Sequence, residues 1–330
     1  MTELRYNPLL GDWTMVADKR QFRPNMPQDF CPFCPGSGKV PEHYEVLKYD
    51  NDFPALMPEP PEPSVAGMGP YRVEKAYGKC EVILYSPDHR ATLPELSLDH
   101  IVKLVNLWTK RYVELNRDPL HQYVMIFENR GEEVGVTMPH PHGQIYAYSK
   151  MPLKIKTELA NCREYYSETG HCLLCDMNRT EEEFGKRIIY ENEHFVAYLP
   201  FFTDYPFGLF IVSKAHRTGL DEFTEAEKRS LALSLKEMIG AMDTLFDRPF
   251  PYMMVLHQRA AHEDETRDYY HFHIEFYPPL REESKIKYYA SSEMGAWAAC
   301  NTQAVEQTAE ALRQAYQKYL EKTWLTRDAE

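Results

Sequence analysis

The same order of short motifs occurs twice along this chain of 330 residues. Each copy begins with a Cys-x-x-Cys pair, continues to a strand-like segment that ends near a histidine, and closes on a His-x-His segment. Repetition of this kind indicates that one structural unit has been duplicated. We therefore expect two halves, 1–152 and 153–330. The repeated residues are Cys31, Cys34, His89 and His140 in the first half, and Cys172, Cys175, His216 and His271 in the second.

Hydrophobic patterns predict the same kinds of element in both halves. Short apolar runs bounded by turn residues indicate strands. Apolar residues that recur at helical spacing behind a serine cap, or behind a Thr-x-x-Glu capping box, indicate amphipathic helices. Each half is thus expected to be an α+β unit. The expected strands lie within 81–85, 123–127, 208–216 and 252–257, and the expected helices begin near Ser97, Thr224 and Thr302.

The repeated cysteines and histidines predict metal sites. Four of the seven cysteines fall in the two Cys-x-x-Cys pairs, and in a reducing compartment such pairs indicate metal rather than disulfide bonds. Two cysteines with two histidines form the set that tetrahedral zinc favours. We therefore predict one zinc site in each half. Neither metal need take part in chemistry, because four protein ligands leave no open position for water.

A rival set of ligands exists for the second site. Glu158, His257, His271 and His273 would offer oxygen and nitrogen atoms, which suit iron or zinc. The second Cys-x-x-Cys pair favours the thiolate set. Zinc is the prediction for both sites, with iron as the alternative at the second.

The segment Pro139–Gln144 has the features of a rigid catalytic turn. Its two histidines, His140 and His142, stand two residues apart in an extended stretch, so they point to the same face. Pro141 fixes the backbone, and Gly143 allows a ligand to approach closely. These features favour a functional turn over a packed strand.

The charge of the chain excludes some classes of partner. The formal net charge is −13, and no basic stripe is present that could release counterions from a nucleic acid. The first residues contain no apolar segment, and no run is long enough to span a membrane. We expect a cytoplasmic protein that grips any phosphate through local side chains.

Four motifs in order carry a resemblance to a known family. They are Cys-x-x-Cys, Ser-Pro-Asp-His, Phe-Glu-Asn-x-Gly and His-Pro-His-Gly-Gln. In these the chain resembles the galactose-1-phosphate uridylyltransferase family of the histidine-triad superfamily, from about Arg5 to Leu312. The resemblance implies a duplicated histidine-triad unit with antiparallel sheets and helices packed on them, assembled as a homodimer. The implied reaction moves UMP from UDP-glucose to galactose 1-phosphate through a histidine.

The resemblance also implies individual roles. His142 would be the nucleophile, and its chemistry fits, because a neutral imidazole can attack phosphorus when an acceptor holds its other N–H. Gln144 stands where hydrolase relatives carry a third histidine, and an amide can donate to a phosphoryl oxygen without supplying a proton. The implied substrate contacts are Asn51, Asp52 and Phe53 for the uridine ribose, Arg20, Arg23, Asn129 and Thr137 for phosphate, Gly135 as a further contact, and Lys287 and Glu293 for the hexose across the dimer interface.

Two alternatives remain open at this stage. A nucleotide-sugar or dinucleoside-polyphosphate phosphorylase would use the same histidine to pass AMP to inorganic phosphate, and the preferred base would separate it from a uridylyltransferase. A zinc-binding interaction protein without catalytic activity would leave His142 and Gln144 without a role.

Overall fold

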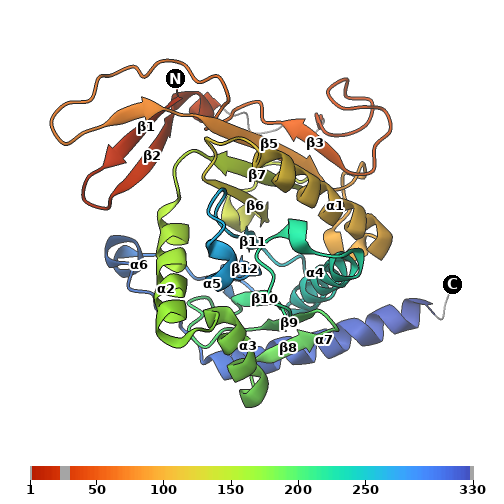
Figure 1. Ribbon diagram of the computed structural model, residues 1–330. Helices are drawn as coiled ribbons and strands as arrows, with labels where there is room; N and C mark the ends of the chain where they lie inside the picture. The colour runs from red at the N-terminus through yellow and green to blue at the C-terminus, as the bar shows by residue number, and fades with distance from the viewer. Residues whose placement is uncertain (1, 23–29, 328–330) are drawn as a thin grey trace.

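A nine-stranded antiparallel sheet forms the body of the protein in the computed structural model, which describes residues 2–22 and 30–327 (Figure 1). Every pair of neighbouring strands in this sheet is antiparallel. In spatial order the strands are β3 (Leu47–Asp50), β5 (Gly78–Leu84), β7 (His142–Tyr148), β6 (Tyr123–Arg130), β11 (Tyr252–His257), β12 (His273–Tyr277), β10 (Leu209–Ser213), β9 (Phe195–Tyr198) and β8 (Ile188–Glu191).

The strand order confirms the duplicated α+β fold. The strands β5-β7-β6 of the first half meet β11-β12-β10 of the second half in mirrored order. The matching strands β6 and β11 pair with each other at the centre, where Glu128 lies opposite Met254. Each half therefore completes its sheet against the other half, which protects two strand edges from solvent.

Helices cover both faces of the sheet. Successive residues of one strand pack against helices on opposite faces. In β10, Leu209 and Ile211 pack with α1, α4 and α7, whereas Phe210 and Val212 pack with α2 and α3. This alternation is what strands buried on both faces require. The helices are α1 (Leu98–Leu115), α2 (Leu153–Thr169), α3 (Leu173–Phe184), α4 (Glu225–Leu245), α5 (Thr266–Tyr269), α6 (Ser291–Ala296) and α7 (Val305–Arg327).

Two small sheets complete the described structure. A three-stranded sheet near the N-terminus has the order β2-β1-β4, and a two-stranded ribbon follows β12. Their strands are β1 (Thr2–Asn7), β2 (Asp12–Ala17) and β4 (Val73–Lys75), and β13 (Leu280–Glu282) and β14 (Lys285–Ile286).

The caps predicted for two helices are present. The Ser97 hydroxyl accepts from the His100 N–H at the start of α1, and Thr224 forms a capping box with Glu227 at the start of α4. The last helix, expected from about Thr302, begins at Val305. Sequence analysis did not predict α2 or α3, although Ile155 and Leu159 of α2 lie at helical spacing and are buried.

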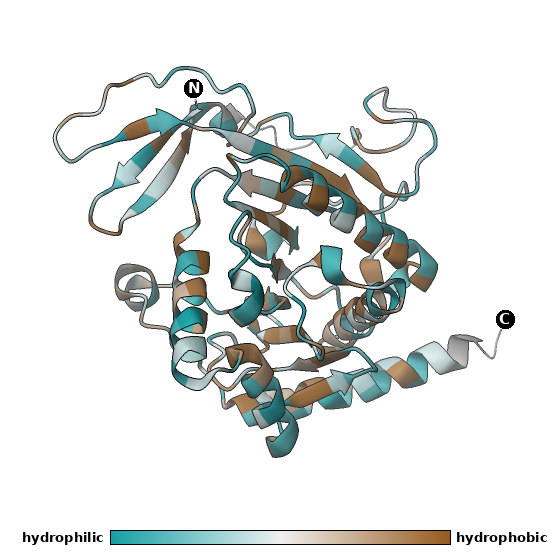
Figure 2. Ribbon diagram, in the orientation of Figure 1, coloured by the Kyte–Doolittle hydropathy of each residue, from teal (hydrophilic) through white to brown (hydrophobic). Residues whose placement is uncertain are grey.

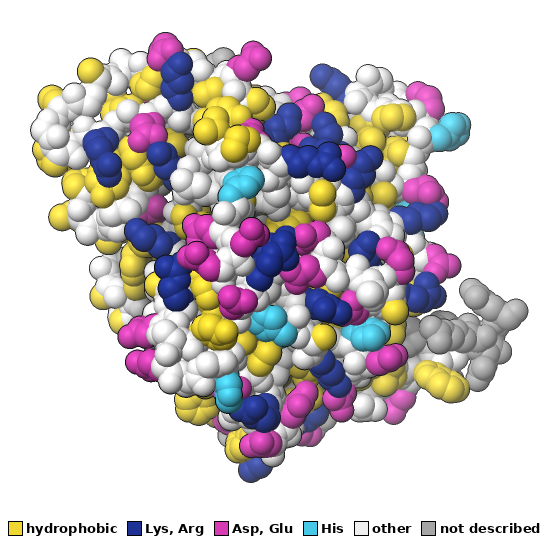
Figure 3. Space-filling view, in the orientation of Figure 1, with side chains coloured by type: hydrophobic (Ala, Val, Ile, Leu, Met, Phe, Trp, Pro, Cys, Tyr) yellow, Lys and Arg dark blue, Asp and Glu magenta, His cyan; other side chains and the backbone are white. Residues whose placement is uncertain are grey.

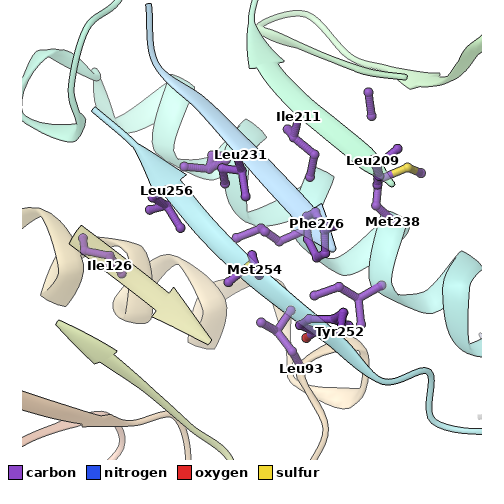
Figure 4. Close-up of a cluster of buried hydrophobic side chains, with 14 of the residues drawn as sticks. Leu93, Ile126, Leu209, Ile211, Leu231, Met238, Tyr252, Met254, Leu256 and Phe276 are labelled. Atoms are coloured by element: carbon purple, nitrogen blue, oxygen red, sulfur yellow. The ribbon is translucent and has the colours of Figure 1, made fainter. Parts of the chain in front are cut away.

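The main core lies between the sheet and α4. Leu231 and Met238 of α4 point toward Leu209, Ile211 and side chains of the central strands (Figure 4). In Figure 2 the central strands are mostly hydrophobic, while the outer faces of the helices are mostly hydrophilic. Acidic and basic side chains intermingle over the face in Figure 3. Among the described helices, none combines the length and the apolar character needed to cross a membrane.

An ion pair joins the two halves beside the central strands. The Arg130 guanidinium of β6 donates to both carboxylate oxygens of Asp243 in α4, at 2.8 and 2.9 Å. Both side chains are largely buried. Since removal of one partner from a buried pair leaves an uncompensated charge, this contact is sensitive to mutation.

We therefore expect Asp243→Asn to lower the free energy of unfolding by about 3 kcal/mol, measured by denaturant titration. The control is Asp247→Asn, because Asp247 pairs with Lys322 at 2.7 Å on the surface, where solvent screens the pair and its removal should cost much less. Equal losses in the two variants would contradict the importance assigned to the pair between the halves.

Candidate active site and metal centres

The first Cys2His2 group assembles as the sequence predicts. Cys31, Cys34, His89 and His140 place their ligand atoms within 4.8 Å of one another. The Nδ1 atom of His140 lies 3.6 and 3.7 Å from the two sulfurs, and that of His89 lies 3.5 Å from Cys34 Sγ. Around a tetrahedral zinc ion, the separation of sulfur and nitrogen ligands is about 3.6 Å. The group therefore has the dimensions of a closed metal site.

Neighbouring contacts fix the orientation of His140. Its Nε2–H donates to the Ser86 carbonyl at 2.8 Å, so the lone pair of the ring stands on Nδ1, which faces the thiols. Burial lowers the pKa of His140 to about 4, which keeps the imidazole neutral and able to bind a metal. Tyr44 supports the cysteine turn, because its hydroxyl donates to the Phe33 carbonyl at 2.6 Å.

The second Cys2His2 group repeats this geometry. The His271 Nδ1 lies 3.6 Å from Cys172 Sγ and 3.4 Å from Cys175 Sγ, and the His216 Nδ1 lies 3.5 Å from Cys175 Sγ. The His271 Nε2–H donates to the Ser213 carbonyl at 2.8 Å, as that of His140 does to Ser86. The two halves therefore hold matching metal-ligand sets.

The rival ligands form a third group beside the second one. Glu158, His257 and His273 also bring ligand atoms within 4.8 Å of one another. The Glu158 carboxylate accepts from His257 Nδ1 at 2.9 Å. The Nδ1 of His271, the fourth member of the rival set, lies against the thiols instead. The thiolate set and the three-residue set are thus separate clusters.

The turn predicted over Pro139–Gln144 is shorter than expected. The strand β7 begins at His142, and Gly143 and Gln144 pair with Ile83 and Val82 of β5. The His142 Nδ1 lies 2.7 Å from the His140 carbonyl oxygen. Because a carbonyl can only accept, Nδ1 carries the proton and the lone pair is on Nε2. Gly143 is required next to it, since a Cβ there would stand 2.3 Å from the Tyr85 hydroxyl and 3.0 Å from the Phe127 carbonyl oxygen. The turn thus fixes the orientation of the imidazole, and Nε2 carries the lone pair when the ring is neutral.

Two cavities meet at His142. One has a volume of about 210 Å³ and the other about 660 Å³, and His142, Thr137 and Met138 line both. Among the residues that sequence analysis selected, the smaller cavity contains Arg20, Asn51, Asp52, Phe53 and Gln144, and the larger contains Asn129, Gly135 and His140. Most of the predicted substrate residues are therefore brought together around one imidazole.

Two predicted residues lie elsewhere, and a third, Arg23, is outside the described residues. Lys287 is buried with its ammonium over the rings of Tyr205 and Tyr289. Glu293 is in α6, where its carboxylate accepts from the Ala290 N–H at 3.3 Å. Within the part of the chain that the structure describes, neither Lys287 nor Glu293 lines the two cavities at His142.

Sequence analysis missed residues that shape the cavities. Phe33 and Val82 form apolar walls of the smaller cavity, and Phe33 could have been found, because it lies inside the first Cys-x-x-Cys pair. Glu128 lines the larger cavity, where burial raises its pKa to about 7 and the Tyr252 hydroxyl donates to it at 3.0 Å. It is the glutamate of the Phe-Glu-Asn-x-Gly motif, but the motif was not interpreted as placing a buried carboxyl at the site.

The fold and the site together define a class of protein. Two α+β units share a sheet, and a His-Pro-His-Gly-Gln turn presents an oriented imidazole between two cavities. This combination is that of a duplicated α+β protein with a histidine-triad-like turn at its site.

Comparison with known proteins defines the family. The family model for the N-terminal domain of galactose-1-phosphate uridyl transferase matches residues 1–152, and the model for its C-terminal domain matches residues 158–323. The chain is 41% identical to galactose-1-phosphate uridylyltransferase of Thermotoga maritima, over 95% of this chain and 98% of the relative. The chain belongs to the galactose-1-phosphate uridylyltransferase family.

Further relatives agree with this assignment. Galactose-1-phosphate uridylyltransferase of Rattus norvegicus is 32% identical, over 94% of this chain and 86% of the relative. A solved uridylyltransferase structure superimposes with a TM-score of 0.88 at 32% identity, covering 96% of this chain and 99% of the other. An ADP-glucose phosphorylase from Arabidopsis thaliana shares the fold, with a TM-score of 0.73 at 24% identity over 95% of this chain and 98% of the other.

The Cys2His2 geometry leads to a prediction about metal content. We expect Cys34→Ala to lose one of two metal ions per chain and several kcal/mol of stability, because the binding energy of a structural metal is part of the folding energy. Elemental analysis and thermal unfolding measure both. Cys300→Ala is the control, since Cys300 is exposed and outside the three metal-ligand groups. A Cys34→Ala variant with unchanged metal content would contradict the assignment.

Proposed function

We propose that this protein transfers UMP from UDP-glucose to galactose 1-phosphate through a covalent uridylyl-histidine. One observation carries the proposal: the Nδ1–H of His142 is held by the His140 carbonyl at 2.7 Å, which leaves the nucleophilic lone pair on Nε2 at the junction of two cavities. Membership of the uridylyltransferase family supports the choice of donor and acceptor.

The reaction has two steps, and in each step one bond to the same phosphorus forms while another breaks. In the first, Nε2 of His142 forms a bond to the α-phosphorus of UDP-glucose, and the bond from that phosphorus to glucose 1-phosphate breaks. In the second, a phosphate oxygen of galactose 1-phosphate attacks the same phosphorus, and the histidine leaves. Gln144 lies in the smaller cavity with His142, and its amide would donate to a phosphoryl oxygen in both steps.

The two cavities suggest where the parts of the donor bind. The smaller one combines the apolar wall of Phe33 and Val82 with the polar pair Asn51 and Asp52, which suits a base and its ribose. Phosphate would be held by Arg20, whose Nη1 donates to the Tyr146 hydroxyl at 3.2 Å, and by Arg23, Asn129, Gly135 and Thr137.

The metals proposed for the two Cys2His2 groups are zinc ions. Sulfur and nitrogen separations of 3.4–3.7 Å in the two groups fit a tetrahedral ion of this size. The ions would hold the fold together and would leave the chemistry to His142. Iron remains the alternative in the second half, where the oxygen and nitrogen ligands Glu158, His257 and His273 stand together.

The hexose part of the site is proposed to come from a second subunit. Glu293 lies away from the two cavities at His142 within the described residues, as expected if it completes the site of a partner in a homodimer. Lys287 is buried beside Tyr205 and Tyr289, so it would have to be uncovered to do the same. The division of the chain into functional halves, 1–152 with the nucleophile and 153–330 with the second metal group and the tail, belongs to the same proposal. So does a cytoplasmic location.

The mechanism predicts that His142→Ala lowers the rate of UDP-galactose formation by at least about 10³-fold. Steady-state kinetics with both substrates varied should give the parallel double-reciprocal lines of a ping-pong reaction in the wild type. ADP-glucose with inorganic phosphate serves as the comparison reaction. Faster turnover of that pair than of UDP-glucose with galactose 1-phosphate would move the protein to the phosphorylase alternative.

The matching histidine of the second half should behave differently. His273 donates its Nδ1–H to the His271 carbonyl at 2.9 Å, but its Nε2 lies 3.3 Å from Glu275 Oε1, and this carboxylate would repel a phosphate. We expect His273→Ala to cost about 1–3 kcal/mol of stability and to retain uridylyl transfer. A folded His273→Ala protein that cannot be uridylylated would refute this.

A further inference from the structure

The second half contains its own cavity at the place that matches the smaller cavity of the first half. Its volume is about 420 Å³, within the range of small-molecule sites. His142 lies opposite Leu84 in the pairing of β7 with β5, and His273 lies opposite Val212 in the pairing of β12 with β10. His273 lines the second cavity as His142 lines the first.

The apolar walls of the two cavities come from the same elements. The residues between the paired cysteines, Pro32 and Phe33 in one half, correspond to Leu173 and Leu174 in the other, and both pairs line their cavity. Val82, opposite Gln144, corresponds to Phe210, opposite Glu275. The second cavity thus keeps the flat apolar surfaces that suit a base.

The features that suit a phosphate are absent from the described lining of this cavity. Glu275 replaces the Gln144 amide, and two further carboxylates, Glu158 and Asp204, also line the cavity. The cavity's described ammonium group, Lys154 Nζ, is already 2.6 Å from Glu275 Oε2. With the second metal on the Cys2His2 group rather than on Glu158, His257 and His273, three carboxylates against one paired ammonium would repel a phosphate.

Polar groups that suit hydroxyls remain. Asn161 on the exposed side of α2, and Thr203 and Asp204 after β9, line the same cavity. Phe202 stands at its rim, edge-on to Phe210 with 6.1 Å between ring centroids. We infer that the second cavity binds an unphosphorylated nucleoside, with the base between the apolar walls and the ribose hydroxyls on Asp204 and its neighbours. This inference rests on the proposed function, which makes the first cavity a nucleotide site.

The inference is tested by counting binding sites with uridine and UMP as probes. Calorimetric titration of the intact wild-type protein should give two equivalents of uridine per chain and one of UMP. One equivalent of uridine, or two of UMP, would overturn the inference. Covalent labelling by UDP-glucose is measured on the same preparation. Loss of labelling would count against the proposed function, whereas normal labelling with a single uridine site would count only against the second cavity.

Variants of the cavity lining test whether the second equivalent of uridine binds in this cavity. Asn161→Trp should fill the cavity and reduce uridine from two equivalents to one, while Ala160→Trp, at the adjacent exposed residue that does not line it, should retain two. Phe202→Ala removes a wall that is 62% exposed, so the fold should tolerate it, and it should weaken the second site about tenfold. Two full-affinity equivalents in both Asn161→Trp and Phe202→Ala would exclude this cavity as the site.

A reverse substitution tests the role of charge. Glu275→Gln restores the side chain that Gln144 provides in the first half, and it releases the Lys154 ammonium from its closest carboxylate. We expect UMP binding to rise from one equivalent to two. If Glu275→Gln still binds one equivalent of UMP, Glu275 is not the reason that phosphate is excluded from the second cavity.

Discussion

The contact between His140 and the two thiols of Cys31 and Cys34 is the constraint on which the active site depends. It joins the cysteine turn, the end of β5 and the turn before β7, which are far apart in the sequence. His140 also carries the carbonyl that receives the Nδ1–H of His142. A metal ion bound by this group would therefore set the orientation of the nucleophile without touching the substrate.

The second half shows what the same framework does without a nucleophile. Its thiol and imidazole group has the same contacts as the group in the first half. The His271 Nδ1 lies against both thiols, and its Nε2–H donates to a backbone carbonyl. The difference lies two residues beyond His273, where Glu275 replaces the amide of Gln144. In the proposed account, this carboxylate, held by Lys154 at 2.6 Å, repels a phosphate where the Gln144 amide would bind one. The two halves thus share a fold, and the proposal assigns them different functions on the basis of this charge.

Much of this structure could be predicted from the sequence, because the informative residues are local motifs that occur twice. The Cys2His2 groups, the capped helices α1 and α4, and β11 were all predicted close to their observed positions. The helix α2 was missed because its buried stripe contains only Ile155, Leu159 and Cys162 and no side chain caps its start. The pairing of β6 with β11 was not predicted, since strand partners from different halves leave no local pattern.

Site residues could be predicted from the sequence only where they belong to a short motif that is typical of a known chemistry. His142 and Gln144 stand in one short motif at the start of β7, but Glu128 and Val82 reach their cavities through strand register, which depends on pairing across the sheet. Lys287 and Glu293 were assigned through resemblance to a family whose site spans two subunits. Within the described residues, neither side chain lines the two cavities at His142.

The central claim is that His142 carries a uridylyl group during the reaction. The most direct measurement is the intact mass of the protein after incubation with UDP-glucose alone, beside the His142→Ala variant. The account predicts a mass increase of one uridylyl group in the wild type, which disappears on addition of galactose 1-phosphate, and no increase in the variant. A uridylyl adduct on the His142→Ala protein, or none on the wild type, would contradict it.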